Sequence, residues 1–119
     1  MLVTGASGGV GHIAVQLARH AGAAVVESGP VDLVFDTRGG EVPAGERVVT
    51  IAEETPSAIY FVVEPDHKQL LELRALVDGG HLRAEVDSVF PLTEARAAFE
   101  RVAGRGKHGK VVLEVGTRD

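Results

Sequence analysis

The chain begins with a glycine-rich segment that is the strongest indication of its fold: Met1-Leu2-Val3-Thr4-Gly5-Ala6-Ser7-Gly8-Gly9-Val10-Gly11. A short apolar run ends in a glycine-dense turn, and a helical pattern follows. Gly5 or Ala6 lets the chain turn, Gly8 lets the backbone approach a bound group, and Gly11 lets helix and strand pack closely. Such a turn aims the first N–H groups of the helix at one point, where a pyrophosphate is favoured. The predicted dinucleotide-binding residues are Gly5, Ala6, Ser7, Gly8, Gly9, Val10 and Gly11.

The spacing alone is not specific, because Ala6 stands where the strict three-glycine motif has its first glycine. A glycine-rich loop without a ligand is the alternative. The rest of the chain has to decide between the two.

Composition bounds the class of protein. The chain has 119 residues, 45% of them hydrophobic and 24% charged, which predicts one globular domain over residues 1–119. Its 12 basic and 17 acidic side chains leave a net charge of −5, and the positive charges are scattered, so we expect no nucleic-acid partner. The absence of cysteine excludes disulfides and thiolate zinc sites and fits a cytoplasmic protein. No apolar run is long enough for a membrane span.

Hydrophobic periodicity predicts an α/β architecture. Helices are expected over 9–21, from Pro65 to the residue before Gly79, and around 92–102. Strands are expected over 31–36, 47–52, 58–63 and 110–115, the last of them within a C-terminal segment covering about 105–119. We therefore predict a trimmed Rossmann-like fold, an open and mostly parallel sheet with helices packed on it.

The connections between the predicted strands are unusually short. Only Ser28-Gly29-Pro30 separates the run 23–27 from Val31, whereas a parallel crossover needs about a dozen residues. The run 23–27 either pairs antiparallel with the next strand or is a link that returns the chain to the sheet. The connections 37–46 and 55–57 are likewise too short for a comfortable crossover helix.

The order of motifs carries a family resemblance. The motifs are Thr4 to Gly11, Ala14-Val15-Gln16-Leu17-Ala18, Val31 to Thr37 with Gly39-Gly40, Arg47 to Ile51, Phe61 to Asp66, Leu70 to Gly80, Val89 to Ala95 and Gly109 to Leu113. This series resembles the coenzyme domain of medium-chain dehydrogenases, in particular the quinone oxidoreductase and enoyl reductase branch. The resemblance implies NADPH-dependent reduction of an activated double bond or a quinone. The GroES-like catalytic domain of that family, which carries its zinc ligands, has no counterpart in this sequence.

The resemblance also assigns cofactor contacts. Asp36, Thr37, Ile51 and Ala52 are expected to line the cleft at the carboxyl ends of the strands, and Phe61 and Val62 to approach the nicotinamide. Glu27, sixteen residues after Gly11, is the acidic candidate for the adenosine ribose and would favour NAD over NADP. Because the crossovers around it are trimmed, we expect binding of NADP or NAD to be weak or lost.

Two rival chemistries are disfavoured. Short-chain dehydrogenases share the glycine opening but need a tyrosine followed four residues later by lysine, and here Tyr60 is followed by Glu64. The five histidines have no i, i+4 spacing, so we expect no metal site and mostly solvated surface histidines.

Three function classes stay open. The first is an NAD(P)H-dependent oxidoreductase acting on a small-molecule substrate, with no catalytic residue assigned. The second is a cofactor-independent lyase, isomerase or cyclase built on the same scaffold, with Asp36, Glu53, Glu54 or Glu85 as acid or base. The third is a non-catalytic dimeric module. In each class we expect a homodimer through the apolar edge run Ile59–Val63.

Overall fold

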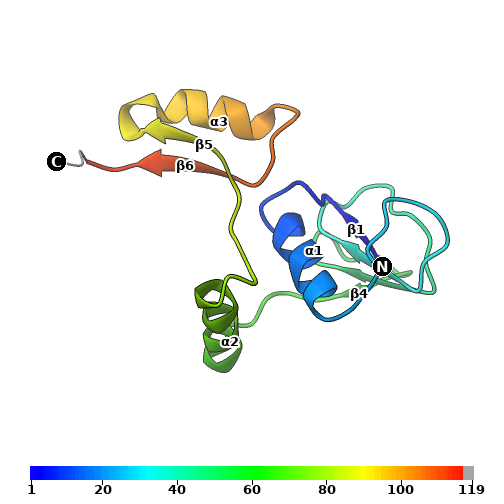
Figure 1. The fold of residues 1–119 in the computed structure, drawn as a ribbon. Coiled ribbons are helices and arrows are strands. Elements are labelled where there is room, and N and C mark those ends of the chain that lie inside the picture. Colours follow the sequence, from blue (N-terminus) through cyan, green and yellow to red (C-terminus); the bar gives the residue numbers. More distant parts are fainter. Residues whose placement is uncertain (117–119) are drawn as a thin grey trace.

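The computed structural model describes residues 1–116 and contains two parallel sheets (Figure 1). The larger sheet has the order β1-β2-β3-β4, formed by β1 (Leu2–Thr4), β2 (Leu33–Asp36), β3 (Arg47–Thr50) and β4 (Ile59–Tyr60). All neighbouring strands in it are parallel, and Thr4, Asp36 and Thr50 stand in register where three of them end. The predicted α/β fold with a mostly parallel sheet is confirmed.

Helix α1 (Gly11–His20) packs against β1, and Gly22, just beyond its C-cap Ala21, has a φ of +91° that favours glycine. The chain then runs beside the start of β1, where the Met1 amino group donates to the Ala24 carbonyl (2.8 Å) and the Val26 N–H donates to the Met1 carbonyl (2.9 Å). Within residues 1–116 this run forms no strand. Antiparallel pairing is therefore wrong, and 23–27 is a link that returns the chain to the sheet.

Two loops without helices connect the remaining strands of the larger sheet. Residues 37–46 join β2 to β3, and residues 51–58 join β3 to β4. The first loop lies directly on the sheet, because a Cβ at Gly45 would stand 2.9 Å from Cγ2 of the fully buried Val34. Close contact of a glycine backbone with the sheet thus replaces a crossover helix, as the short connections predicted.

A second unit follows helix α2 (His67–Asp78). It consists of β5 (Val86–Pro91), a 3₁₀ turn η1 (Leu92–Glu94), α3 (Ala95–Ala103) and β6 (Lys110–Glu114). β5 and β6 pair in parallel and α3 packs on both. Asp87 on β5 binds Arg101 on α3 through two bonds of 2.8 Å and also accepts the His108 N–H. β5 was not predicted from the sequence, and an irregularity between Val86 and Ser88 interrupts its pairing with β6.

Several predicted boundaries were too generous. α1 begins at Gly11 because the residues before it form the turn, and β2 begins at Leu33, which pairs with Arg47, the first residue of β3. Strands β3, β4 and β6 likewise end earlier than predicted, and residues 105–109 form a loop. Residues 117–119 of the predicted C-terminal segment lie outside the described residues.

The entry to α2 also differs from the prediction. Asp66 caps the helix by accepting the Gln69 N–H (3.0 Å), so the helix begins at His67 and Pro65 stands outside it. No helix among residues 1–116 is long and apolar enough to cross a membrane.

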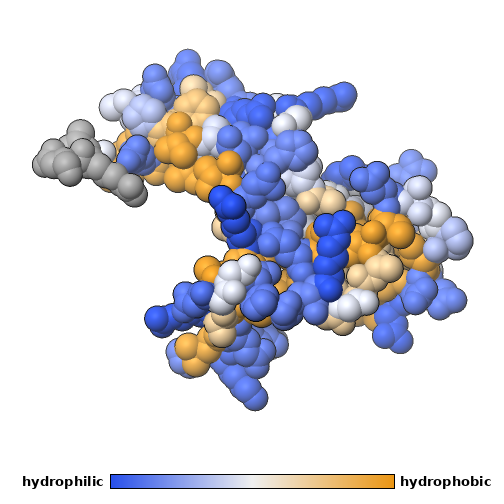
Figure 2. All heavy atoms as spheres, viewed as in Figure 1, coloured by the Kyte–Doolittle hydropathy of each residue, from blue (hydrophilic) through white to orange (hydrophobic). Residues whose placement is uncertain are grey.

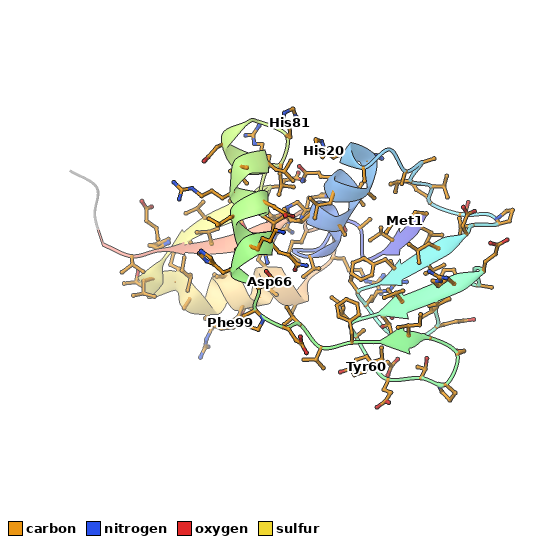
Figure 3. The ribbon with its side chains drawn as sticks, turned by 90° about the horizontal axis from the view of Figure 1, so that it is seen from below. Met1, His20, Tyr60, Asp66, His81 and Phe99 are labelled. Carbon is orange, nitrogen blue, oxygen red and sulfur yellow. The ribbon has the colours of Figure 1, made fainter. Side chains whose placement is uncertain are left out.

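Apolar side chains are unevenly covered. Leu2, Val3 and Val34 are buried in the larger sheet, and Figure 2 shows hydrophobic atoms at the surface over both the β5–β6 unit and the larger sheet. The β4 edge is also open: Tyr60 lies at the margin of the sheet in Figure 3, and Val62 and Val63, which follow it, are 68% and 80% exposed.

Candidate functional site

The glycine turn after β1 is tight. Gly5 has a φ of +67°, and its carbonyl accepts the Gly8 N–H at 2.9 Å. A Cβ at Gly11 would stand 1.9 Å from the Gly5 carbonyl oxygen, so only glycine fits where the helix crosses the turn. These contacts give Gly5 and Gly11 the turning and packing roles that the sequence predicted for glycines at this place.

The amino end of α1 points into this turn. Among residues 1–116, no side chain caps the helix at Val10, and its first turn holds no acidic residue. No carboxylate of the first turn therefore offsets the partial positive charge of this helix end. An anion is the ligand that this end attracts.

A residue far along the sequence completes the turn. Lys110, the first residue of β6, lies over Gly9: its Nζ stands 2.6 Å from the position that a Gly9 Cβ would occupy. The preceding Gly109 donates its N–H to the Ser7 carbonyl at 2.7 Å. Sequence analysis placed Lys110 only in a strand. The signal available for it was Gly109, whose φ of +85° turns the chain into β6.

Three neighbouring strands share a buried polar cluster where they end. The Asp36 carboxylate accepts the Thr4 hydroxyl (2.6 Å) and the Thr50 hydroxyl (2.7 Å). It also accepts the backbone N–H groups of Arg38 and Gly39. Burial raises the pKa of Asp36, but these hydrogen bonds together outweigh it and hold the pKa below its ordinary value. Both carboxylate oxygens are occupied, so Asp36 tethers strands and does not offer a free base.

The other predicted contacts follow the same strand ends. Thr37 is tied to β1, because its hydroxyl donates to the Thr4 carbonyl (2.6 Å) and its N–H donates to the Thr4 hydroxyl (3.0 Å). Ile51 donates its N–H to the Asp36 carbonyl, and Ala52 donates its N–H to the Thr50 hydroxyl. Phe61 and Val62 directly follow β4. The fold thus brings all the predicted contacts except Glu27 to one edge of the sheet.

Glu27 lies away from that edge. It is exposed and follows Val26, which is bonded to Met1 at the amino end of β1; Figure 3 labels Met1 there. The glycine turn follows the carboxyl end of the same strand. In the doubly wound dinucleotide fold the first strand is central, and a strand beyond it carries the ribose-binding acid. Within residues 1–116, β1 is an edge strand of the larger sheet, and no assigned strand lies beyond it.

The remaining carboxylates are dispersed. Glu53 accepts the Gly40 N–H at 2.8 Å and, with Asp36 and Thr50, lines a cavity of about 370 Å³ under the two crossover loops. The side chains of Glu54 and Glu85 are exposed. Residues 1–116 gather no group of three histidine, cysteine or acidic side chains that could hold a metal ion, so these residues do not fit a zinc site.

Comparison with known proteins agrees with this architecture. A mitochondrial probable zinc-binding oxidoreductase of Arthroderma benhamiae is 36% identical over 75 residues, which cover 63% of this chain and 21% of that protein. The quinone oxidoreductase of Coxiella burnetii has a similar structure, with a TM-score of 0.79 at 24% identity over 97% of this chain and 52% of that one.

A thermostable alcohol dehydrogenase from Pyrobaculum aerophilum, with cobalt and zinc bound, gives a TM-score of 0.60 at 24% identity over 94% of this chain and 49% of that one. The chain thus spans about a fifth of the curated relative and about half of each solved structure. A model of the zinc-binding dehydrogenase family matches residues 9–113. The protein therefore belongs to that family, within the medium-chain dehydrogenase superfamily, and corresponds to the C-terminal part of such proteins.

Proposed function

We propose that this chain binds the pyrophosphate of a nicotinamide dinucleotide at the turn Gly5–Gly11 and serves a hydride-transferring oxidoreductase of the quinone reductase type. The observation that carries the proposal is the Lys110 ammonium group over Gly9, beside the uncapped end of α1. A cation, a helix amino end and glycines that expose the backbone together match a doubly charged diphosphate.

In this proposal the cofactor extends from the turn along the carboxyl ends of β3 and β4. Ile51 and Ala52 after β3, and Phe61 and Val62 after β4, offer backbone and apolar surface for the nicotinamide. When bound, the dinucleotide supplies the hydride, and the chain orients it. The acceptor that we propose is a quinone or an activated carbon–carbon double bond.

The edge position of β1 limits the strength and the selectivity of binding. Among the described residues no strand is assigned beyond β1, and Glu27 lies at the other end of that strand, so no acid is in place there to hold the adenosine ribose or to repel a 2′-phosphate. We therefore propose weak binding of both NADPH and NADH, with little discrimination between them.

We also propose a homodimer through the edge run Ile59–Val63. In this run Ile59, Phe61 and Val63 are 56%, 45% and 80% exposed, and β4 offers an unpaired strand edge. In sedimentation velocity the protein should run as a dimer, and Val62→Lys should shift it to the monomer. A monomeric parent protein would refute the dimer.

The test of the proposed function is a titration of NADPH and NADH followed by nicotinamide fluorescence. Lys110→Gln should lower the affinity roughly tenfold, since a charge-assisted hydrogen bond is lost. Gly8→Asp, which puts a negative charge in the turn, should abolish binding.

Lys68→Gln is the matched control, because Lys68 is an exposed lysine on α2, and it should leave the affinity unchanged. No binding by the parent protein at millimolar cofactor would refute the proposal. So would equal affinities of the parent protein and the Lys110 variant.

A further inference from the structure

His12 is the buried histidine of α1, only 7% exposed. The other four histidines are exposed, as predicted for most of them. Its Nδ1 lies 2.7 Å from the Gly8 carbonyl, inside the glycine turn, and its Nε2 lies 3.0 Å from the Glu85 backbone N–H, in the segment before β5. One ring therefore joins the turn to the segment that leads into β5.

The two partners of the ring determine its protonation state. A carbonyl oxygen only accepts, so Nδ1 must carry a hydrogen, and a backbone N–H only donates, so Nε2 must be bare. The ring is thus neutral, with its hydrogen on Nδ1. A second proton, on Nε2, would set two donors against each other and remove the bond to Glu85.

The backbone of Glu85 links His12 to Lys110. The Glu85 carbonyl accepts the Lys110 backbone N–H at 2.8 Å, and the Lys110 side chain then reaches over Gly9. A Cβ at Gly109 would stand 2.2 Å from the Glu85 carbonyl oxygen, so the two segments are in close contact.

A neighbouring pair of bonds fixes the same segment to α1. Gln16 Nε2 donates to the Arg83 carbonyl (2.8 Å), and Gln16 Oε1 accepts the Arg83 N–H (2.9 Å). The titratable residues of the segments joined to this part of α1 are Arg83 and Glu85, before β5, and Lys110 on β6, and each is bonded here through its backbone, while the neighbour of His12 on α1, Gln16, is neutral.

We propose that His12 is a positioning residue: its neutral ring holds Glu85, and through it Lys110, over the dinucleotide turn, so that cofactor binding weakens when His12 is protonated. This inference rests on the proposed function. Affinity for NADPH should be roughly three- to tenfold lower at pH 5.5 than at pH 8, the effect of one hydrogen bond.

Two substitutions separate the two contacts of the ring. His12→Gln keeps an acceptor near the Nε2 position for the Glu85 N–H but cannot be protonated, and so should keep the affinity and lose the additional fall below pH 7. His12→Asn keeps a donor near the Nδ1 position for the Gly8 carbonyl but loses the contact with Glu85, and so should bind weakly at every pH. His67→Gln, at an exposed histidine that begins α2, should keep the full pH response.

The experiment is NADPH titration of the full chain at pH 8, 7, 6 and 5.5, paired with ¹H–¹⁵N NMR of the imidazole nitrogens and of the Glu85 amide. We expect the Nδ1–H tautomer at pH 8 and reduced protection of the Glu85 amide from exchange at pH 5.5. An Nε2–H tautomer, or a pH response that persists in His12→Gln, would overturn the inference.

The NMR measurement tests the role of His12 separately from cofactor binding. Absence of NADPH binding at pH 8 refutes the proposed function, and the effect of His12 on the second unit is then decided by the Glu85 amide. Loss of its protection at low pH in the parent protein, but not in His12→Gln, supports that effect. Unchanged protection in the parent protein refutes it.

Discussion

The two sheets of this protein are stabilised by different interactions. In the larger sheet, Leu2, Val3 and Val34 are buried between short strands, and the Asp36 carboxylate ties three strand ends together. In the β5–β6 unit, Ala98 is buried, while Val86 and Val89 remain 51% and 55% exposed, and the Asp87–Arg101 pair connects strand to helix. The larger sheet, in which two of the three connections are loops without helices, thus keeps a buried core, whereas the β5–β6 unit, which has a helix packed on both strands, leaves apolar side chains exposed.

The candidate site lies where these two units meet. The larger sheet contributes the glycine turn, and the second unit contributes Lys110 and the bond from Gly109 to Ser7. Changes in either unit should therefore alter binding, but only changes in the larger sheet should remove most of the stability.

The largest expected effect is that of Gly11→Ala. Its Cβ would collide with the Gly5 carbonyl, so α1 must move away from the turn. We expect the free energy of unfolding to fall by about 3 kcal/mol, the upper range for overpacking, and dinucleotide binding to be lost. Urea denaturation followed by circular dichroism measures the first effect, and cofactor fluorescence measures the second.

The control for this substitution is Gly104→Ala in the second unit. Gly104 has a φ of −77°, and the nearest atom to its added Cβ would stand at 3.4 Å, an ordinary contact. It should change stability by less than about 1 kcal/mol. Equal losses in the two variants would show that the turn is no more tightly packed than the end of α3.

The second effect is that of Asp36→Asn, which removes the charge that ties three strands together. One amide oxygen cannot replace two carboxylate oxygens, and an NH₂ group then faces backbone donors, so we expect a loss of about 2 kcal/mol. Since folding lowers the pKa of Asp36, its contribution is present above the unfolded value of about 3.9 and is lost as the pH falls through the folded value.

Urea midpoints at pH 7, 5, 4 and 3 measure this dependence. The parent protein should lose stability below about pH 4, and Asp36→Asn should lose less over the same interval. Asp32→Asn, at an exposed carboxylate just before β2, should follow the parent protein. Parallel curves for the parent protein and Asp36→Asn would mean that the buried carboxylate does not stabilise the sheet.

The elements that could be predicted from the sequence are those determined by residues close to one another in the chain. The opening glycines, the apolar spacing of α1 and the β-branched runs of β2 and β3 predicted the parallel sheet and the turn. The short connections predicted loops in place of helices. These features depend on steric and hydrophobic preferences that neighbouring residues express by themselves.

What the sequence did not reveal depends on contacts across the chain. Lys110 meets Gly9 across a hundred residues, and His12 meets Glu85 across seventy-three. The sequence distance from Gly11 predicted Glu27 as a cofactor contact. In the structure, however, Val26 is bonded to Met1, so Glu27 lies near the amino end of β1 and away from the glycine turn. Asp36 looked like an available acid, and only the register with Thr4 and Thr50 shows that its oxygens are occupied.

The smallest global effect is expected from Asp87→Asn, which tests the second unit alone. Hydrogen bonds, chiefly those from Arg101, hold the pKa of Asp87 well below its ordinary value, so this link is present above about pH 4 and weakens under stronger acid. At pH 7 we expect faster amide exchange in β5 and β6 and unchanged exchange in β1 to β3, because the core of the larger sheet does not include Asp87.

Asp78→Asn is the matched control. It breaks the Arg74–Asp78 pair on α2, whose atoms are 3.6 Å apart and whose side chains are 77% and 70% exposed, against 36% and 7% for Arg101 and Asp87. An exposed pair of this kind contributes little, so exchange should not change. If Asp87→Asn also accelerates exchange in β1 to β3, the two sheets unfold as one unit. The two sheets would then differ in packing but not in stability.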